Sequence, residues 1–222
     1  MSPPDRQLLL KLRPEGEPTL DNFVVGINGE LLERLRMFGT ADQIYLWGAT
    51  GSGRSHLLAA IARRGSNHPV KQIAAADVGD TLDVEADSLL VIDDVHQLSA
   101  AAQIALFRIF IAARENGVSL LLSGPQPPLQ LNLREDLRTR IGQMLIYEIK
   151  GLSDEEKTSA LRHYAEQRGL PVDDAVLRHL LLHGRRDLPS LLATVDRLDE
   201  LSLSLQRPAT LPLLRQLMQT DT

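Results

Sequence analysis

Cysteine is absent from the 222 residues of this sequence. Disulfide bonds and thiolate metal sites are therefore excluded, and a reducing compartment, the cytoplasm, is the expected location. Long hydrophobic runs are absent too: segments such as SLLVI and VSLLLS have the length of a strand and are too short to cross a membrane. No signal peptide, internal repeat or low-complexity segment is visible.

The sequence also lacks an excess of positive charge, because its formal net charge is −5. The surface as a whole is thus not expected to attract nucleic acid, although a local basic face is compatible with this total. Hydrophobic residues make up 43% of the chain and charged residues 24%, as in ordinary soluble globular proteins. The length suits one large domain, or a core domain with a small one.

Strands and helices are predicted to alternate through the first two thirds of the chain. Short apolar runs predict strands at 43–47, 70–75, 87–94, 118–124 and 143–149. Apolar spacing and length predict helices at 55–64, 101–115 and 132–140. In the second of these helices, the residues at helical spacing are Ile104, Phe107, Arg108 and Ile111.

After Gly151 the pattern contains no further strand. Ser153 and Glu156 form a capping-box signature that opens a helix, and two or three more helices follow. We therefore predict a parallel-sheet α/β domain over 17–150 and a small helical domain over 151–222. The proline-rich segment 1–16 is predicted to be an extended tail.

Residues 48–55, GATGSGRS, have the spacing of a phosphate-binding loop, G-x-x-x-x-G-K-[ST], with Arg54 in place of the lysine. The loop follows a predicted strand and opens a helix, where backbone N–H groups and the helix dipole can bind phosphate. Ser55 would offer its hydroxyl to Mg²⁺. Arg54 keeps the charge but is a planar fork, so β-phosphate binding should survive better than guidance of a γ-phosphate. The alternative is a glycine-rich turn without a ligand.

The segment LLVIDDVHQL ends an apolar strand in Asp93 and Asp94. Carboxylates at the C-terminal end of a strand lie in the ligand crevice of an open α/β sheet. Asp93 would hold the Mg²⁺ water shell, and Asp94 could orient a water. Alone, the two aspartates would more often cap a helix, but together with the glycine loop they indicate a nucleotide site.

Four segments, in order, resemble the DnaA replication initiators, which are AAA+ ATPases. TLDNFVVGINGELLERL is similar to the adenine-pocket segment of that family, and GATGSGRSHLL and LLVIDDVHQL are similar to its Walker A and Walker B motifs. LLLSGPQPPLQLNLREDLRTRI is similar to its sensor 1 and box VII regions. The resemblance implies a P-loop NTPase with a five-stranded parallel sheet and a small C-terminal helical lid.

The resemblance also implies ADP or ATP with Mg²⁺ as cofactors. The cofactor-binding residues that it implies are Val24, Val25, Gly48, Gly51, Ser52, Gly53, Arg54, Ser55, His56 and Arg186. Ser55 and Asp93 would be the magnesium-binding residues, and Asp94 would be catalytic.

Three features resemble, more narrowly, the Hda group of DnaA homologues, the regulatory inactivators of DnaA. The Walker arginine in GRSHLL is typical of that group, and the chain ends after the lid helices without a sequence-specific DNA-binding domain. The tail also fits the Q-L-x-L-x-L peptide that binds the sliding clamp, the beta subunit of DNA polymerase III, through Gln7, Leu8, Leu10 and Leu12. By pattern alone, an edge strand of the domain itself, formed by Leu8, Leu10 and Leu12, is the favoured alternative, and the resemblance reverses that preference.

The partners implied by the resemblance are DnaA and the sliding clamp, with no membrane, and a monomer and a homodimer both stay open. The box VII arginine falls on Arg140, which the resemblance makes an arginine finger donated in trans to ATP on a neighbouring DnaA subunit. Such a finger contributes about 10³–10⁵ in rate. Without the resemblance, Arg134, Arg138 and Arg140 would all be solvated surface residues.

Three positions depart from the family pattern where a γ-phosphate is normally held. Besides Arg54, the sensor 1 acid falls on Pro125, with Ser123 as the nearest polar substitute. The sensor 2 arginine falls on Pro189, with Arg185 and Arg186 nearby.

From these departures we expect a regulator that prefers ADP and has weak or no ATPase activity alone. It would stimulate hydrolysis of DnaA-bound ATP and so negatively regulate replication initiation. The alternatives are a DnaA-like ATPase or helicase loader, and a clamp adaptor with a degenerate nucleotide site.

Overall fold

The computed structural model describes residues 17–64, 68–185 and 187–219. The first part of the chain forms a parallel sheet with the strand order β2-β3-β4-β1-β5. The strands are β1 (Gln43–Trp47), β2 (Val70–Ala74), β3 (Leu89–Asp93), β4 (Ser119–Gly124) and β5 (Leu145–Glu148). The five predicted strands and the parallel sheet are therefore confirmed.

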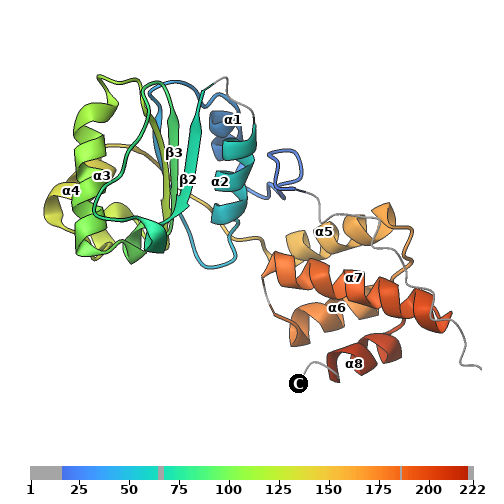
Figure 1. The fold of residues 1–222 in the computed structure, drawn as a ribbon. Helices are drawn as coiled ribbons and strands as arrows, with labels where there is room; N and C mark the ends of the chain where they lie inside the picture. Colours follow the sequence, from blue (N-terminus) through green and yellow to red (C-terminus); the bar gives the residue numbers. More distant parts are fainter. Residues whose placement is uncertain (1–16, 65–67, 186, 220–222) are drawn as a thin grey trace, which may run out of the picture.

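Helices cover both faces of the sheet, as Figure 1 shows. The cluster on one face includes α1 (Gly29–Arg36) and α2 (Arg54–Arg63), and that on the other includes α3 (Ala100–Ala113) and α4 (Glu135–Ile141). Alternate strand residues point to opposite faces: Leu89 and Val91 pack with α2, whereas Leu90 and Ile92 pack with α3. Because both faces are covered, central strands such as β4 are buried along their whole length.

The predicted spacing in α3 does not mark its buried face. Ile111 is 57% exposed and Arg108 is exposed, whereas the buried residues of α3 are Ala102, Gln103, Ala105, Leu106, Phe110 and Ala113. The helix sequence AAAQIALFRIFIAA is apolar nearly all round, so spacing alone cannot select a face. Ala102, Ala105 and Ala113 face inward, and the side chain of Ile111 points outward.

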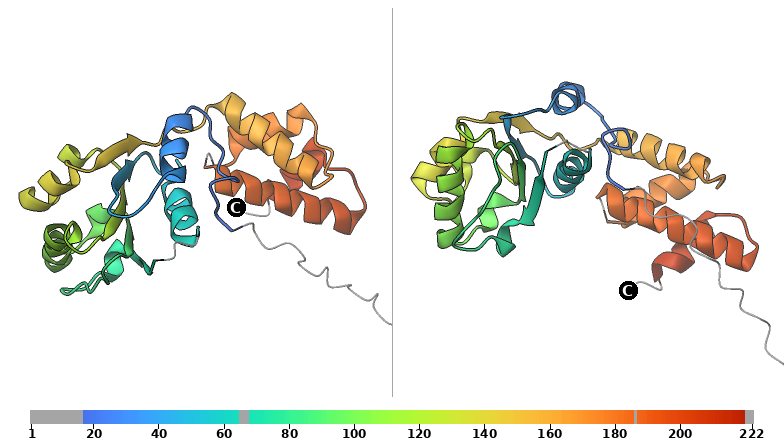
Figure 2. Two further views of the ribbon diagram at one scale, coloured as in Figure 1. Left: turned by 90° about the horizontal axis from the view of Figure 1, so that it is seen from above. Right: turned by 45° about the horizontal axis from the view of Figure 1, so that its top comes forward.

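Four helices form the C-terminal lid, which confirms the predicted helical domain. They are α5 (Asp154–Gln167), α6 (Asp174–His183), α7 (Leu188–Leu205) and α8 (Leu211–Gln219). The predicted capping box of Ser153 and Glu156 is present at the start of α5. The lid has an apolar core of its own, centred on Leu161, Leu177 and Leu214. Figures 1 and 2 show it as a separate body on the α1 and α2 side of the sheet.

A buried asparagine joins the lid connection to the N-terminal segment. Asn28, only 5% exposed, accepts the backbone N–H of Lys150 at 2.8 Å. Its amide donates to the carbonyl oxygens of Lys150 and Val25, both at 3.0 Å. These bonds hold the residue after β5 against the chain just ahead of α1. Within the described ranges, no helix is both long and apolar enough to span a bilayer.

Candidate nucleotide site and the exposed arginine of α4

The glycine loop lies between β1 and α2, and its backbone conformation requires glycine. Gly51 and Gly53 have φ values of +79° and +99°, which side chains rarely adopt. A Cβ at Gly53 would lie 2.6 Å from the ring of Phe23, and one at Gly48 would lie 2.7 Å from the carbonyl oxygen of Ile149. The loop therefore takes its shape only with glycine at these positions.

The start of α2 presents free donors to this loop. The first hydrogen bond of α2 runs from the N–H of Leu57 to the carbonyl of Gly53 at 3.0 Å, so the N–H groups of residues 54–56 have no partner within the helix. The hydroxyl of Ser52 is buried and has no hydrogen-bond partner among the described residues. An orphaned buried donor beside a helix N-terminus fits a phosphate oxygen.

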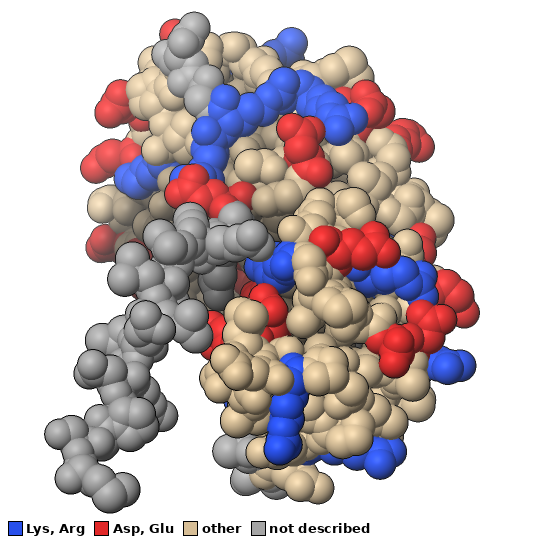
Figure 3. Space-filling model, turned by 90° about the vertical axis from the view of Figure 1, so that its right-hand side faces the viewer, with Lys and Arg blue, Asp and Glu red and all other residues tan. Residues whose placement is uncertain are grey.

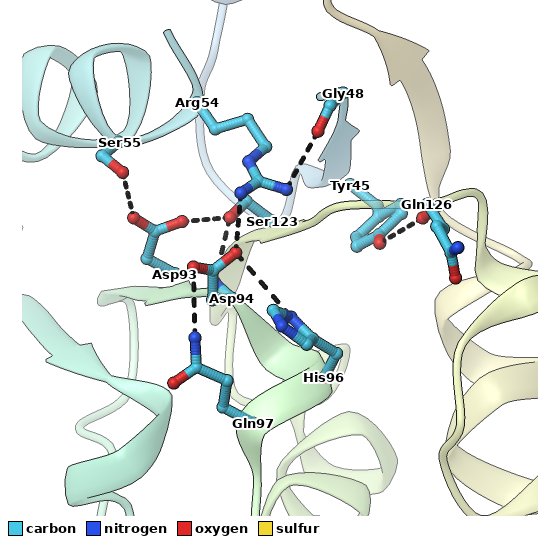
Figure 4. Close-up of polar contacts among 10 residues, drawn as sticks. All are labelled: Tyr45, Gly48, Arg54, Ser55, Asp93, Asp94, His96, Gln97, Ser123 and Gln126. Carbon is cyan, nitrogen blue, oxygen red and sulfur yellow. Dashed lines mark hydrogen bonds and ion pairs between the residues drawn. The ribbon is translucent and has the colours of Figure 1, made fainter. Parts of the chain in front are cut away.

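Ser55 and Asp93 meet at the end of β3, as the sequence led us to expect. The Ser55 hydroxyl donates to one oxygen of Asp93, and the Ser123 hydroxyl donates to the other (Figure 4). Magnesium ions commonly bind one or two protein oxygens and complete their shell with phosphate and water, so Ser55 and Asp93 would hold the ion. Among the described residues, no group of three or more His, Asp or Glu side chains has metal-binding geometry.

Arg54 bridges the glycine loop and the second aspartate. Its Nη1 donates to the carbonyl of Gly48 at 3.0 Å, and its Nη2 lies 2.9 Å from Oδ1 of Asp94. The side chain of Arg54 is 10% exposed, so this contact lies inside the site. Asp94 has a left-handed backbone, φ +54°, and its N–H donates to the Ser123 hydroxyl at 3.1 Å.

Ser123 has no donor left with which to replace the sensor 1 acid. Its hydroxyl gives its single proton to Asp93 and accepts from the N–H of Asp94, and the residue is fully buried. Next to it, burial raises the pKa of Tyr45, while Arg54 acts in the opposite direction and Asp94 in the same one. The Tyr45 hydroxyl donates to the carbonyl of Gln126 at 2.7 Å.

The segment implied to hold adenine lies against the first turn of α2. His56 donates from Nε2 to the carbonyl of Thr19 at 2.9 Å, and its ring centroid is 5.6 Å from that of Phe23. Val24 and Val25 are half-buried, and Val25 packs on the apolar cluster of this face. Asn28, which ties Val25 to the lid connection, was missed, because its sequence context indicated only a turn.

The lid approaches the loop through the start of α7. A Cβ at Gly51 would lie 2.9 Å from the Cβ of Asp187, the N-cap of α7. Hydrogen bonding with the Ser190 side chain lowers the pKa of Asp187, and the N–H of Ser190, which donates to this carboxylate at 2.9 Å, acts in the same direction. Pro189, at the expected sensor 2 position, lies in the first turn. The side chain of Arg185 is 84% exposed and 3.5 Å from Asp187. Arg186 lies outside the described residues, as do Gln7, Leu8, Leu10 and Leu12.

Arg140 lies on α4, on the face of the sheet away from the lid (Figure 1). It is exposed, and no ion pair involves it within the described part of the chain, whereas Arg134 pairs with Asp136 at 2.7 Å. Both arginines line a broad depression of about 750 Å³ together with Phe107 and Thr139. Among the described residues, Arg140 thus has no ion-pair partner, and the same holds for Arg138 on α4 and Arg108 on α3.

Comparison with known proteins identifies the lid and the fold. A family model for the Hda lid domain matches residues 154–218. Domain III of the Thermotoga maritima initiation protein DnaA is similar over 94% of this chain and 98% of its own, with a TM-score of 0.74 and 20% identity.

Two further solved structures share the fold. AMPPCP-bound DnaA from Aquifex aeolicus has a TM-score of 0.67 and 21% identity over 83% of this chain, which spans 65% of that protein's length. A Thermotoga maritima RuvB mutant has a TM-score of 0.69 and 18% identity over 94% of this chain and 73% of its own. Residues 154–218 therefore match the Hda lid domain, and the chain shares the fold of these DnaA and RuvB structures.

Proposed function

We propose that this protein is a cytoplasmic regulator that binds an adenine nucleotide, ADP in preference, and stimulates hydrolysis of ATP bound to DnaA. It would dock on the DNA-loaded sliding clamp through Gln7, Leu8, Leu10 and Leu12, and it would donate Arg140 to the neighbouring ATP site. Conversion of ATP-DnaA to ADP-DnaA would restrain replication initiation.

Nucleotide binding is supported by the glycine geometry of residues 48–53, the orphaned Ser52 hydroxyl and the Ser55–Asp93 pair. It is further supported by the AMPPCP held by a DnaA structure of the same fold. A preference for ADP is supported by the residues that a γ-phosphate would meet. Ser123 is already engaged, and Pro125 and Pro189 replace polar sensors.

The observation that carries the proposal is the exposed Arg140, unpaired among the described residues, on α4. Because α4 and the glycine loop helix α2 pack on opposite faces of the sheet, Arg140 cannot serve the chain's own nucleotide. A guanidinium that faces outward can neutralise charge on a phosphoryl group held by a second molecule.

Arg140→Ala tests this role. We expect stimulated hydrolysis of DnaA-bound ATP, measured with clamp and DNA present, to fall by about 10³-fold or to background. Binding of ADP and of clamp should be unchanged. Arg134→Ala is the matched control on the same surface, because Arg134 is already paired with Asp136. Full stimulation by Arg140→Ala would remove this residue from the mechanism.

Clamp docking is tested by a pull-down with the intact chain and the double variant Gln7→Ala/Leu8→Ala. Each buried leucine contributes roughly 1.5–3 kcal/mol before ordering costs. Loss of even one anchor should thus weaken a micromolar complex about tenfold or more. Basic and acidic groups are interspersed on the face in Figure 3, so bulk attraction to DNA is a poor substitute for this peptide.

Two other functions predict different outcomes. A DnaA-like ATPase or helicase loader would assemble with ATP and hydrolyse it faster with single-stranded DNA. A clamp adaptor with a degenerate nucleotide site would carry no ADP after purification, which mass spectrometry of denatured protein detects.

A further inference from the structure

The pair of Arg54 and Asp94 places a charge contact inside the candidate site. Oδ1 of Asp94 lies 2.9 Å from the guanidinium yet accepts no well-aligned hydrogen bond, so charge attraction holds the contact. The second Nη of Arg54 donates to the carbonyl of Gly48, so the guanidinium spans from the loop to the end of β3 (Figure 4).

Asp94 is restrained by its surroundings. A φ of +54° is uncommon for a residue other than glycine and must be stabilised by neighbours. The Ser123 hydroxyl fixes its N–H, and Gln97 Nε2 donates to Oδ2 at 3.3 Å. His96 Nδ1 lies 3.7 Å from Oδ1. Both carboxylate oxygens of Asp94 therefore already face side chains of the same protein. A carboxylate that orients a water molecule must have an oxygen free to accept a hydrogen bond from it, so these contacts hinder that role.

The choice of arginine over lysine decides whether this restraint survives near phosphate. A lysine ammonium is a single compact charge, which phosphate would draw away from Asp94. A guanidinium has five N–H donors in a fixed fork, so it can face a phosphate oxygen and still hold both Gly48 and Asp94.

We infer that Arg54 is a positioning residue that restrains Asp94, so that a nucleotide at the glycine loop is retained without hydrolysis. The inference rests on the proposed nucleotide binding and adds that Arg54 slows hydrolysis of the bound nucleotide, an effect called the brake below. The arginine at the Walker A lysine position would then itself favour retention of the nucleotide.

Arg54→Lys tests the brake. We expect single-turnover ATP hydrolysis by the isolated protein to rise roughly hundredfold, the lower end of the range for a freed acid–base group. The gain should disappear in Arg54→Lys/Asp94→Asn. Arg63→Lys is the matched control, because Arg63 lies at the other end of α2 and pairs with Glu17. If Arg54→Lys binds ATP without any gain in hydrolysis, the inference is wrong.

A second measurement needs no nucleotide. The free energy of unfolding in urea is compared for Arg54→Gln, Asp94→Asn and the double variant. If the two side chains are paired, the double variant loses less unfolding free energy than the sum of the losses of the two single variants. Strictly additive losses would overturn the pairing. If the wild type does not bind fluorescent ADP, the proposed nucleotide binding is wrong. If it binds ADP but the losses of unfolding free energy are additive and Arg54→Lys hydrolyses ATP no faster, only the inference about Arg54 is wrong.

Discussion

The glycine loop and the α4 surface differ in how their charged groups are used. At the loop, Arg54 faces Asp94, and both oxygens of Asp93 accept from serine hydroxyls. On α4, Arg140 is exposed without an ion pair among the described residues. An inward-facing cation can retain a ligand, whereas an outward-facing one is available to another molecule. Under the proposed function, nucleotide binding and catalytic support of a second molecule would thus lie on two faces of one sheet.

Gly53→Ala should break the loop side of this comparison with the largest effect. The added Cβ combines a φ of +99° with a 2.6 Å contact to Phe23, so ADP affinity should fall roughly tenfold to hundredfold. Calorimetric titration measures the affinity. Gly29→Ala is the control, because nothing lies within 4 Å of a Cβ there. Equal affinities for the two variants would contradict the glycine requirement.

Asn28→Ala tests whether the hydrogen bonds of Asn28 support both the glycine loop and the α4 surface. It removes two hydrogen bonds to Lys150 and one to Val25, which should lower the free energy of unfolding by about 2–4 kcal/mol. Urea unfolding measures the loss. ADP affinity should weaken as well, because Asn28 also holds Val25, while the exposure of Arg140 stays unchanged. A loss under about 0.5 kcal/mol would mean that water replaces these bonds.

Tyr164→Phe provides a reference in the lid, apart from both regions. The Tyr164 hydroxyl donates to Asp196 at 2.9 Å, and Arg168 pairs with the same carboxylate at 2.7 Å. Removing the hydroxyl should cost about 1–2 kcal/mol in unfolding free energy without changing ADP affinity. Tyr147→Phe, for which no hydrogen bond is described, should cost less. A changed ADP affinity would show that lid packing reaches the loop.

The Tyr164 phenol also predicts a pH dependence. Burial, with Asp196 adding to it, raises the pKa of Tyr164 to about 12. Because the folded pKa is above the unfolded one, this contribution to stability is complete below pH 10 and is lost as pH rises towards 12. Unfolding midpoints between pH 9 and pH 11 should therefore fall more in the wild type than in Tyr164→Phe. Parallel falls would contradict this assignment.

The smallest expected effect concerns His179, also in the lid. Partial burial lowers its pKa, with the neighbouring His183 and then Arg215 adding to the shift. A depressed folded pKa means that this contribution to stability is present above pH 6.5 and is lost as pH falls. His183→Gln should raise the pKa of His179 by a fraction of a unit in an NMR titration. An unchanged pKa of His179 would show that His183 does not influence it, although the ring centroids are 4.3 Å apart.

Strands and lid helices could be predicted because their signals are local. Apolar runs marked the five strands, and Ser153 with Glu156 marked the start of α5. The buried face of α3 could not be predicted, because a helix that is apolar all round carries no periodic signal.

The site was predictable only in its residue types. Glycines at 48, 51 and 53 and the aspartates after β3 indicated a nucleotide site. The contact of Arg54 with Asp94 depends on β1 and β3 lying on either side of β4, an order that spacing along the chain does not encode. The bridge made by Ser123 needs β4 beside β3, and the bonds of Asn28 join residues 122 positions apart. Such contacts are set by the order of strands in the sheet, which the sequence of a single segment does not reveal.

The place of β1 between β4 and β5 bears on how the protein is made by the ribosome. Strand β1 pairs with β4 on one side and β5 on the other, so its neighbours are synthesised long after it. Before residue 148 has left the ribosome, β1 cannot pair with β5. Asn28 likewise cannot bond to Lys150 until that residue has left the ribosome. We therefore expect the proposed nucleotide site to form only after β5 has left the ribosome, and fragments that stop before β5 should lack it.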